Sequence, residues 1–288
     1  MRNFCDLIRG CSAITFSFAL ITTTIFAFAS HAYADDAKPQ LVIGGTGSAL
    51  GGMQLLAKAF SEDHPDIKAI VLPSLGSGGG IKALSAGKID LALSARPLKD
   101  KESEQGLTAR LYARTPIVFA THKKISSDRI DLSELVSIYS GTTSVWADGT
   151  SLRLILRPEE ESDTKLLRGL SPEMDAAVTA AHSRKDLLVA LNDQDNATAL
   201  ETVPGSFGLT TLAQILSESR SLKPLVFNGK TASLEALQAG EYPYFKSLHI
   251  VAGNAPSAPA KAFIAFVFST TGQNILTATG HSVADPGQ

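Results

Sequence analysis

The chain has 288 residues, of which 19% are charged and 44% hydrophobic, and its formal net charge is −2. This length and composition fit one or two ordinary globular domains. The near-neutral charge, without any lysine- or arginine-rich block, excludes the basic face that nucleic-acid binding normally needs.

The first 34 residues have the pattern of a secretory signal peptide. Arg2 and Arg9 form a short basic head, an apolar run covers residues 13–28, and Ala32-Tyr33-Ala34 provides a small-residue cleavage site. The alternative, a transmembrane anchor, is less suited to an apolar run that is short and rich in threonine. We therefore expect a periplasmic protein that begins at Asp35.

Both cysteines, Cys5 and Cys11, lie within this removable segment. Cys11 precedes the apolar run, so it is not placed as a lipoprotein cysteine. The mature chain would then have no disulfide and no lipid anchor. No second long apolar stretch follows, so we do not expect the mature chain to span a membrane.

From residue 40 onward, predicted strands and helices alternate. Apolar segments predict strands at 40–43, 67–72 and 89–93, and each of the first two is followed by a glycine-rich turn and an amphipathic helix. This βαβαβ order predicts a largely parallel sheet with helices on both faces, in the α/β class.

The second part of the chain continues in the same style. Further strands are expected at 116–121, 152–156, 225–227 and 248–251. Helices are expected at 131–135, from Ser162, after the N-cap candidates Ser171 and Ser183, and over 260–276.

Three strand-to-helix loops share one chemistry. They are Thr46–Leu50, Gly76–Gly80 and Arg157–Thr164, all rich in glycine, serine or threonine or carrying an arginine. Free backbone N–H groups at a helix start, hydroxyl donors and the helix dipole together favour an anion such as phosphate or carboxylate. A single loop of this kind is explained equally well by tight packing, whereas three with an arginine indicate an anion site.

Motifs of the common enzyme classes are incomplete. The dinucleotide fingerprint lacks its third glycine, since Leu50 stands there, and the P-loop pattern ending at Thr231 has Pro224 in place of its first glycine. No G-x-S-x-G elbow is present, and the histidines lack metal-ligand spacing. We expect no enzyme activity, no cofactor and no metal.

Five fragments, in order, resemble the substrate-binding component of phosphate ABC transporters, within the type II periplasmic-binding-protein superfamily. The resemblance covers nearly all of the mature chain. The fragments are Leu75-Gly-Ser-Gly-Gly-Gly-Ile-Lys-Ala-Leu, Gly87-Lys-Ile-Asp-Leu-Ala-Leu-Ser-Ala-Arg-Pro-Leu98, Val203-Pro-Gly-Ser-Phe-Gly208, Gly240-Glu-Tyr-Pro-Tyr-Phe245 and Phe263-Ile-Ala-Phe-Val-Phe-Ser-Thr-Thr-Gly-Gln273.

This resemblance implies a two-lobed α/β fold with the ligand in a cleft between lobes joined by two crossover strands. Lobe 1 would combine residues 38–119 with 246–288, and lobe 2 would cover residues 120–245. The lobes would close over the ligand by hinge motion.

The resemblance also implies the binding residues. In the first loop these are Ser48 and the backbone N–H of Leu50, and in the second loop the hydroxyl of Ser77. The third loop contributes the last set, Arg157, Ser162 and Thr164.

The third loop and the segment after residue 93 depart from the family pattern. Asp163 replaces a glycine, and Ala95 stands where some members have a carboxylate that accepts the proton of hydrogen phosphate. Asp163 either takes over that proton-accepting role or points away and favours the helix start. Arg96 either binds the anion or pairs with a carboxylate. Glu159–Glu161 are expected to be a solvated acidic loop.

We therefore expect an extracytoplasmic, monomeric binding protein that captures a small oxyanion, phosphate first, and delivers it to an ABC transporter permease. Sulfate, molybdate and tungstate are the alternative ligands, and a sensor or scavenger without an importer is the alternative role. A secreted enzyme on this fold is less favoured because no nucleophile–base pair can be identified.

Overall fold

The computed structural model describes residues 38–284. The predicted signal peptide, both cysteines and the predicted start at Asp35 lie outside the described residues. Within the described range, no helix has the length and apolar character needed to cross a membrane.

The first three strands form a parallel layer linked by helices. Its elements are β1 (Gln40–Gly45), α1 (Leu50–Asp63), β2 (Lys68–Val71), α2 (Gly76–Ser85) and β3 (Leu91–Ser94). Ile43 of β1 lies opposite Val71 on one side and Leu91 on the other. The βαβαβ order predicted for this segment is confirmed.

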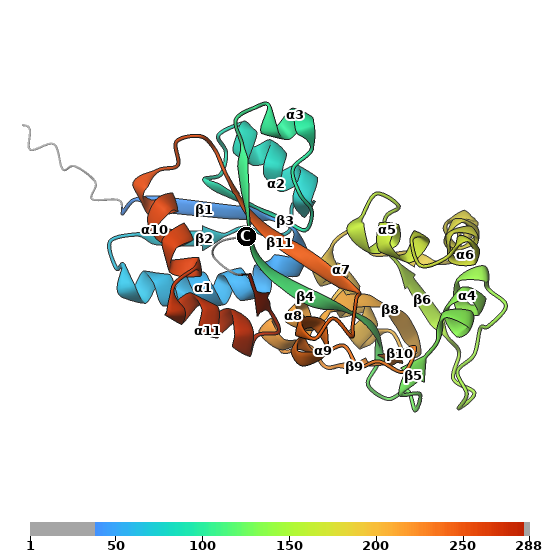
Figure 1. Ribbon diagram of the computed structural model, residues 1–288. Coiled ribbons are helices and arrows are strands. Elements are labelled where there is room, and N and C mark those ends of the chain that lie inside the picture. Colours follow the sequence, from blue (N-terminus) through green and yellow to red (C-terminus); the bar gives the residue numbers. More distant parts are fainter. Residues whose placement is uncertain (1–37, 285–288) are drawn as a thin grey trace, which may run out of the picture. The chain divides into compact units, whose positions relative to one another are not determined.

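Two longer strands, β4 (Thr108–His122) and β11 (Phe245–Ala252), run side by side and antiparallel (Figure 1). β11 also pairs with β3, and β4 pairs with β8 (Ser206–Thr211), both antiparallel. The main path of the sheet is therefore β2-β1-β3-β11-β4-β8, continued by β6 (Arg153–Leu156) and β7 (Leu188–Val189). The expectation of a largely parallel sheet is wrong at its middle, because β4 and β11 do not belong to βαβ units.

Beyond β8 the sheet is parallel again. β6 (Arg153–Leu156) pairs with β8 on one side and with β7 (Leu188–Val189) on the other. Four helices belong to this part: α4 (Leu132–Ser140), α5 (Ser162–Arg168), α6 (Pro172–Ser183) and α7 (Asp193–Thr202).

The smaller elements complete the chain. They are the 3-10 turn Gly47–Ala49, α3 (Asp100–Ser103), β5 (Arg129–Ile130), α8 (Leu212–Ser217), β9 (Leu222–Pro224), β10 (Val226–Phe227), α9 (Leu234–Gln238), α10 (Ala258–Val267), α11 (Thr270–Ala278) and β12 (Ser282–Val283).

Buried apolar side chains gather on two sets of elements. One set draws on residues 41–113 and 248–283, and the other on residues 117–244. We call these two parts the first and second lobe. β4 contributes Tyr112 to the core of the first lobe and Phe119 to that of the second. The residue boundaries predicted from the resemblance stay a prediction.

Two helix predictions are corrected by the structure. The single helix expected over 260–276 is two helices, α10 and α11, because the Ser269 hydroxyl accepts a hydrogen bond from the backbone of Gly272 and starts a new helix. Ser183 is the last residue of α6 and not an N-cap, whereas Ser171 caps α6 as predicted, with Pro172 at its first position.

Candidate functional site

Arg157 follows the carboxyl end of β6, and only 4% of its surface is exposed. Its Nη1 donates a hydrogen bond to the carbonyl oxygen of Ala190 at 2.7 Å. Three carboxylates surround the rest of the guanidinium: Asp163 at 3.5 Å, Asp193 at 3.6 Å and Glu161 at 3.8 Å. Arg157 therefore lies at the centre of a buried charged site.

Lys246, on β11, is the second cation of this site. Its Nζ lies 2.6 Å from Asp163 Oδ1, 2.8 Å from Ser48 Oγ and 3.5 Å from Asp193 Oδ1. The residue is 5% exposed, so the ammonium group is almost entirely removed from water. We refer to Arg157, Lys246, Asp163 and Asp193 as the charged cluster.

Burial and charge pairing oppose one another in the charged cluster. Burial would raise the pKa of the Asp193 carboxyl, but Lys246 and Arg157 hold that pKa below its ordinary value. Burial would lower the pKa of Lys246, but Asp163 and Asp193 keep it above its ordinary value. The cluster thus brings two basic and two acidic side chains into contact.

Glu161 lies at the edge of the charged cluster. Burial raises the pKa of its carboxyl, although the charge of Arg157 acts in the opposite direction. In the loop Glu159–Glu161, which was expected to be solvated, Glu161 keeps 34% of its side chain exposed but also lies 3.8 Å from Arg157. Glu159 and Glu160 do lie at the surface, where they pair with Arg168 and Lys165.

Asp163, in the first turn of α5, points toward the two cations and not toward solvent. Its side chain is 3% exposed and contacts Lys246 and Arg157. The alternative in which Asp163 points away from the site is wrong. Its role in reading the proton of an oxyanion stays a prediction.

The first predicted loop reaches the charged cluster through Ser48. Its hydroxyl donates a hydrogen bond to Asp193 Oδ1 at 2.8 Å and receives one from Lys246. The backbone N–H of Leu50, by contrast, donates to the carbonyl of Gly47 and closes the 3-10 turn. The structure therefore brings Ser48 to the site, while the N–H of Leu50 has an internal partner.

Of the other predicted hydroxyls, those of Ser77 and Thr164 bond to backbone groups. Ser77 Oγ accepts a hydrogen bond from the backbone of Ala95 at 2.9 Å. Thr164 Oγ1 donates to the carbonyl oxygens of Arg157, at 3.2 Å, and Pro158, at 2.9 Å. Ser162 is the first residue of α5. Thr164 thus positions the arginine loop.

Arg96 pairs with a carboxylate, which was one of the two alternatives left open by the sequence. Its guanidinium donates two hydrogen bonds of 2.8 Å to Glu102 and one to the carbonyl of Pro97. The hydrogen bond to Arg96 lowers the pKa of Glu102 to about 2, so the pair stays charged. The structure does not bring Arg96 to the charged cluster.

A cavity of about 240 Å³ opens beside Arg157, and we call it the Arg157 cavity. Residues of both lobes line it: Ser74, Leu75, Gly76, Arg157, Glu161, Leu191, Asn192 and Asp193. The segment from Ser74 to Gly76 enters α2, so the second predicted loop borders this space. Arg157 is the only basic residue among those that line this cavity.

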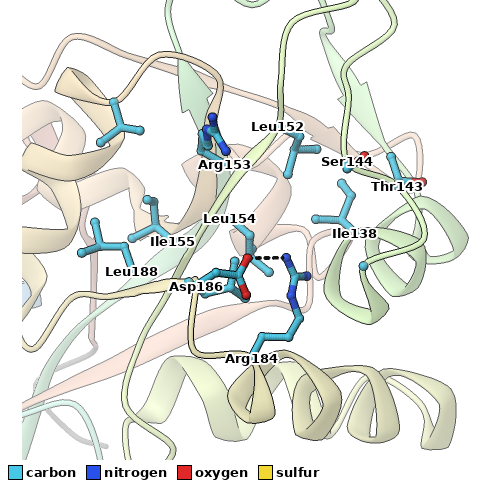
Figure 2. Close-up of a pocket in the computed structure, with 13 residues that line it drawn as sticks. Ile138, Thr143, Ser144, Leu152, Arg153, Leu154, Ile155, Arg184, Asp186 and Leu188 are labelled. Atoms are coloured by element: carbon cyan, nitrogen blue, oxygen red, sulfur yellow. Dashed lines mark hydrogen bonds and ion pairs between the residues drawn. The ribbon is translucent and has the colours of Figure 1, made fainter.

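A second pocket, of about 200 Å³, lies in the second lobe among α4, β6 and the segment before β7 (Figure 2). Its walls are mostly apolar, and Arg184 points toward Asp186 at 3.3 Å. It shares no lining residue with the Arg157 cavity and contains none of the predicted anion-binding residues.

Over residues 38–284, no group of three or more histidine, cysteine, aspartate or glutamate side chains is arranged to hold a metal ion.

Sequence reasoning missed Lys246 and Asp193. A signal for Lys246 existed: in β11 buried positions alternate with less buried ones, and Lys246 has the phase of Leu248 and Ile250. A lysine in the buried phase of a strand requires a partner. Asp193 follows an N-cap, Asn192, at a position where an acidic residue is common, so its role could not be separated from helix capping.

Comparison with known proteins gives one family model, described as a PBP superfamily domain, which matches residues 31–271. Among curated proteins, the phosphate-binding protein PstS of Staphylococcus aureus (strain USA300) is 24% identical over 243 residues, which is 77% of this chain and 71% of that protein.

Solved structures show the same fold. One is a protein from Clostridium perfringens, named as a phosphate ABC transporter substrate-binding protein and solved with bound phosphate. It matches with a TM-score of 0.71 and 19% identity, over 85% of this chain and all of that one. A phosphate-binding protein from Stenotrophomonas maltophilia matches with a TM-score of 0.63 and 15% identity, over 85% of this chain and 91% of that one.

Proposed function

Because the chain belongs to the PBP superfamily, we propose that it is an exported binding protein that captures inorganic phosphate and delivers it to an ABC importer. The two-lobed α/β fold supports a ligand site between the lobes. The relatives described above are named as phosphate-binding proteins and support phosphate as the first ligand to test.

The observation that carries this proposal is the unfilled hydrogen-bonding capacity of Arg157. A guanidinium has five N–H donors. Among the described residues only the carbonyl of Ala190 takes a short hydrogen bond from it, whereas the surrounding carboxylates stand 3.5 to 3.8 Å away. Charge-assisted hydrogen bonds to an oxyanion are shorter, about 2.7–2.9 Å. The Arg157 cavity lies beside this guanidinium.

Isothermal titration calorimetry of residues 35–288 against phosphate, sulfate, molybdate and tungstate tests the ligand. We expect one phosphate to bind per chain, more tightly than the other anions. If another oxyanion binds more tightly, the protein is still an oxyanion-binding protein, but its ligand is that anion and not phosphate. Absence of heat with all of them, in a folded protein, would refute the proposal.

Export and transport are separate parts of the proposal. N-terminal sequencing of protein recovered from the periplasm should begin at Asp35, and retention of Met1 would contradict export. Phosphate uptake by cells should fall when the gene is deleted and return when it is restored. Unchanged uptake, with phosphate binding intact, would favour a sensor or scavenger.

A further inference from the structure

A hydrogen bond from Ser48 to the charged cluster joins the two lobes. Ser48 lies in the 3-10 turn Gly47–Ala49 of the first lobe, and Asp193 is the first residue of α7 in the second. The Ser48 hydroxyl donates to Asp193 Oδ1 at 2.8 Å, and both residues are buried. A second bond between the same elements runs from Gln194 Nε2 to the carbonyl of Gly47 at 3.0 Å.

The Asp193 carboxylate is surrounded by the donors that an oxyanion would need. Its Oδ1 accepts from the Ser48 hydroxyl and lies 3.5 Å from Lys246 Nζ, and its Oδ2 lies 3.6 Å from Arg157 Nη2. A hydroxyl, an ammonium and a guanidinium thus converge on one carboxylate. Ser48 and Arg157 are also two of the residues that the sequence predicted to bind the anion.

We infer that the Asp193 carboxylate serves as an internal anion, which holds the lobes together without ligand and which phosphate must displace in order to bind. This inference rests on the proposed function. It adds Lys246 to the anion-binding residues, because its ammonium group would exchange Asp193 for the incoming anion as a partner.

The charge of the cluster supports displacement over simple addition. Arg157 and Lys246 already pair with Asp163 and Asp193, and Glu161 lies next to them. Adding a doubly charged anion to this buried set would leave a large excess of negative charge, which is costly away from water. When Asp193 withdraws, the two cations and the Ser48 hydroxyl become available.

The packing around Asp193 is consistent with a tight closing contact. A Cβ atom added at Gly47 would lie 2.5 Å from Asp193 Oδ2 and 2.7 Å from Gln194 Oε1. The absence of a side chain at Gly47 therefore allows α7 to approach the first lobe closely enough for the Ser48–Asp193 bond.

Two measurements test the inference on residues 35–288. The first is phosphate affinity by calorimetry for the unmodified protein, Asp193→Ala and the isosteric Asp193→Asn. The second is the separation of spin labels attached through Lys82→Cys and Lys185→Cys, both exposed and on different lobes, measured without phosphate. Residues 35–288 contain no natural cysteine, so these labels are unique.

We expect both Asp193 variants to bind phosphate at least about tenfold more tightly. Without phosphate, Asp193→Ala should also lengthen the label separation, and phosphate should shorten it again. Asp195→Ala is the matched control, because it removes an exposed carboxylate from the same turn of α7 that bonds to Asn192 and not to the cations. It should change neither readout.

Weaker phosphate binding by folded Asp193→Asn would overturn the inference, because Asp193 would then assist the ligand. A label separation that is the same with and without the Asp193 carboxylate would also overturn it. If no variant binds phosphate, the proposed function fails. A separation that still lengthens in Asp193→Ala would then support the closing contact alone.

Discussion

Arg157 lies within 3.6 Å of two buried carboxylates, and its one short hydrogen bond to the described residues goes to the carbonyl of Ala190. Arg157→Ala should therefore weaken phosphate binding at least about a hundredfold, roughly 2.7 kcal/mol at about 1.4 kcal/mol per tenfold. Arg157→Lys should recover only part of the loss, because an ammonium keeps the charge without the planar pair of donors. Calorimetry measures both.

Arg153→Ala is the matched control for this prediction. Arg153 is exposed, lies on the same strand, β6, and lines the second pocket, which is separate from the Arg157 cavity. The Arg153→Ala variant should bind phosphate with the same affinity as the unmodified protein. Unchanged affinity in folded Arg157→Ala would remove Arg157 from the site.

Asp163 touches both cations, so its charge bears on which anions are accepted. A buried carboxylate repels a fully ionised anion but can accept the O–H of a protonated one. Asp163→Asn should therefore reduce the preference for phosphate over sulfate at least about tenfold, measured by titrating both anions from pH 5 to 9. An unchanged preference with a lower melting temperature would show that Asp163 is only a counter-ion of Lys246 and Arg157.

The sequence could predict only part of this site. Arg157, Asp163 and Ser48 stand in strand-to-helix loops, where local chemistry indicates an anion site. Lys246 and Asp193 join them only because β11 and α7 reach the same place from distant segments, and local sequence does not report such contacts. Arg96 could not be decided either, because its partner Glu102 lies in the next helix.

Among the elements, the break between α10 and α11 is the clearest departure from the sequence prediction. The apolar spacing of Phe263 and Phe266 continues to Leu276, so periodicity alone indicates one helix. The break depends on a Ser269 cap and on close packing at Gly272, and neither changes the hydrophobic pattern. The strands of the first lobe were predictable because each is an apolar run followed by a glycine turn.

Gly272→Ala tests this packing. A Cβ atom at Gly272 would collide with the carbonyl of Phe266 and lie 2.7 Å from that of Val267. We expect a loss of more than about 1 kcal/mol in the free energy of unfolding, although alanine ordinarily stabilises a helix relative to glycine by about 0.5–1 kcal/mol. Urea denaturation measures the change.

Gly78→Ala, in α2, is the control of opposite sign. No heavy atom lies within 4 Å of a Cβ added there. Its substitution should therefore stabilise the protein by the ordinary helix preference, about 0.5–1 kcal/mol. Equal effects at Gly78 and Gly272 would show that backbone crowding does not set the break.

For the whole molecule, acid sensitivity should depend on His281, which is completely buried. Burial lowers the pKa of its imidazole from 6.5 to about 4. Between these values the unfolded chain takes up a proton that the folded chain does not. The contribution of His281 to the free energy of unfolding is therefore fully present above about pH 6.5. It falls by roughly 3 kcal/mol as the pH drops toward 4.

Urea denaturation at pH 4.5, 7 and 9 measures this dependence. His281→Leu cannot be protonated, so its free energy of unfolding should fall less between pH 7 and 4.5 than that of the unmodified protein. Between pH 7 and 9 the two slopes should agree, which provides the internal control. Parallel slopes over the acid range would assign the sensitivity to other groups.

β4 has a further consequence for how the molecule comes apart. Its first half pairs with β11, its second half pairs with β8, and its side chains enter both cores. Unfolding of either lobe would remove hydrogen-bond partners from β4 and would therefore destabilise the other lobe. The amides near the middle of β4 should therefore exchange with deuterium only through global unfolding, and the two lobes should denature in a single cooperative transition.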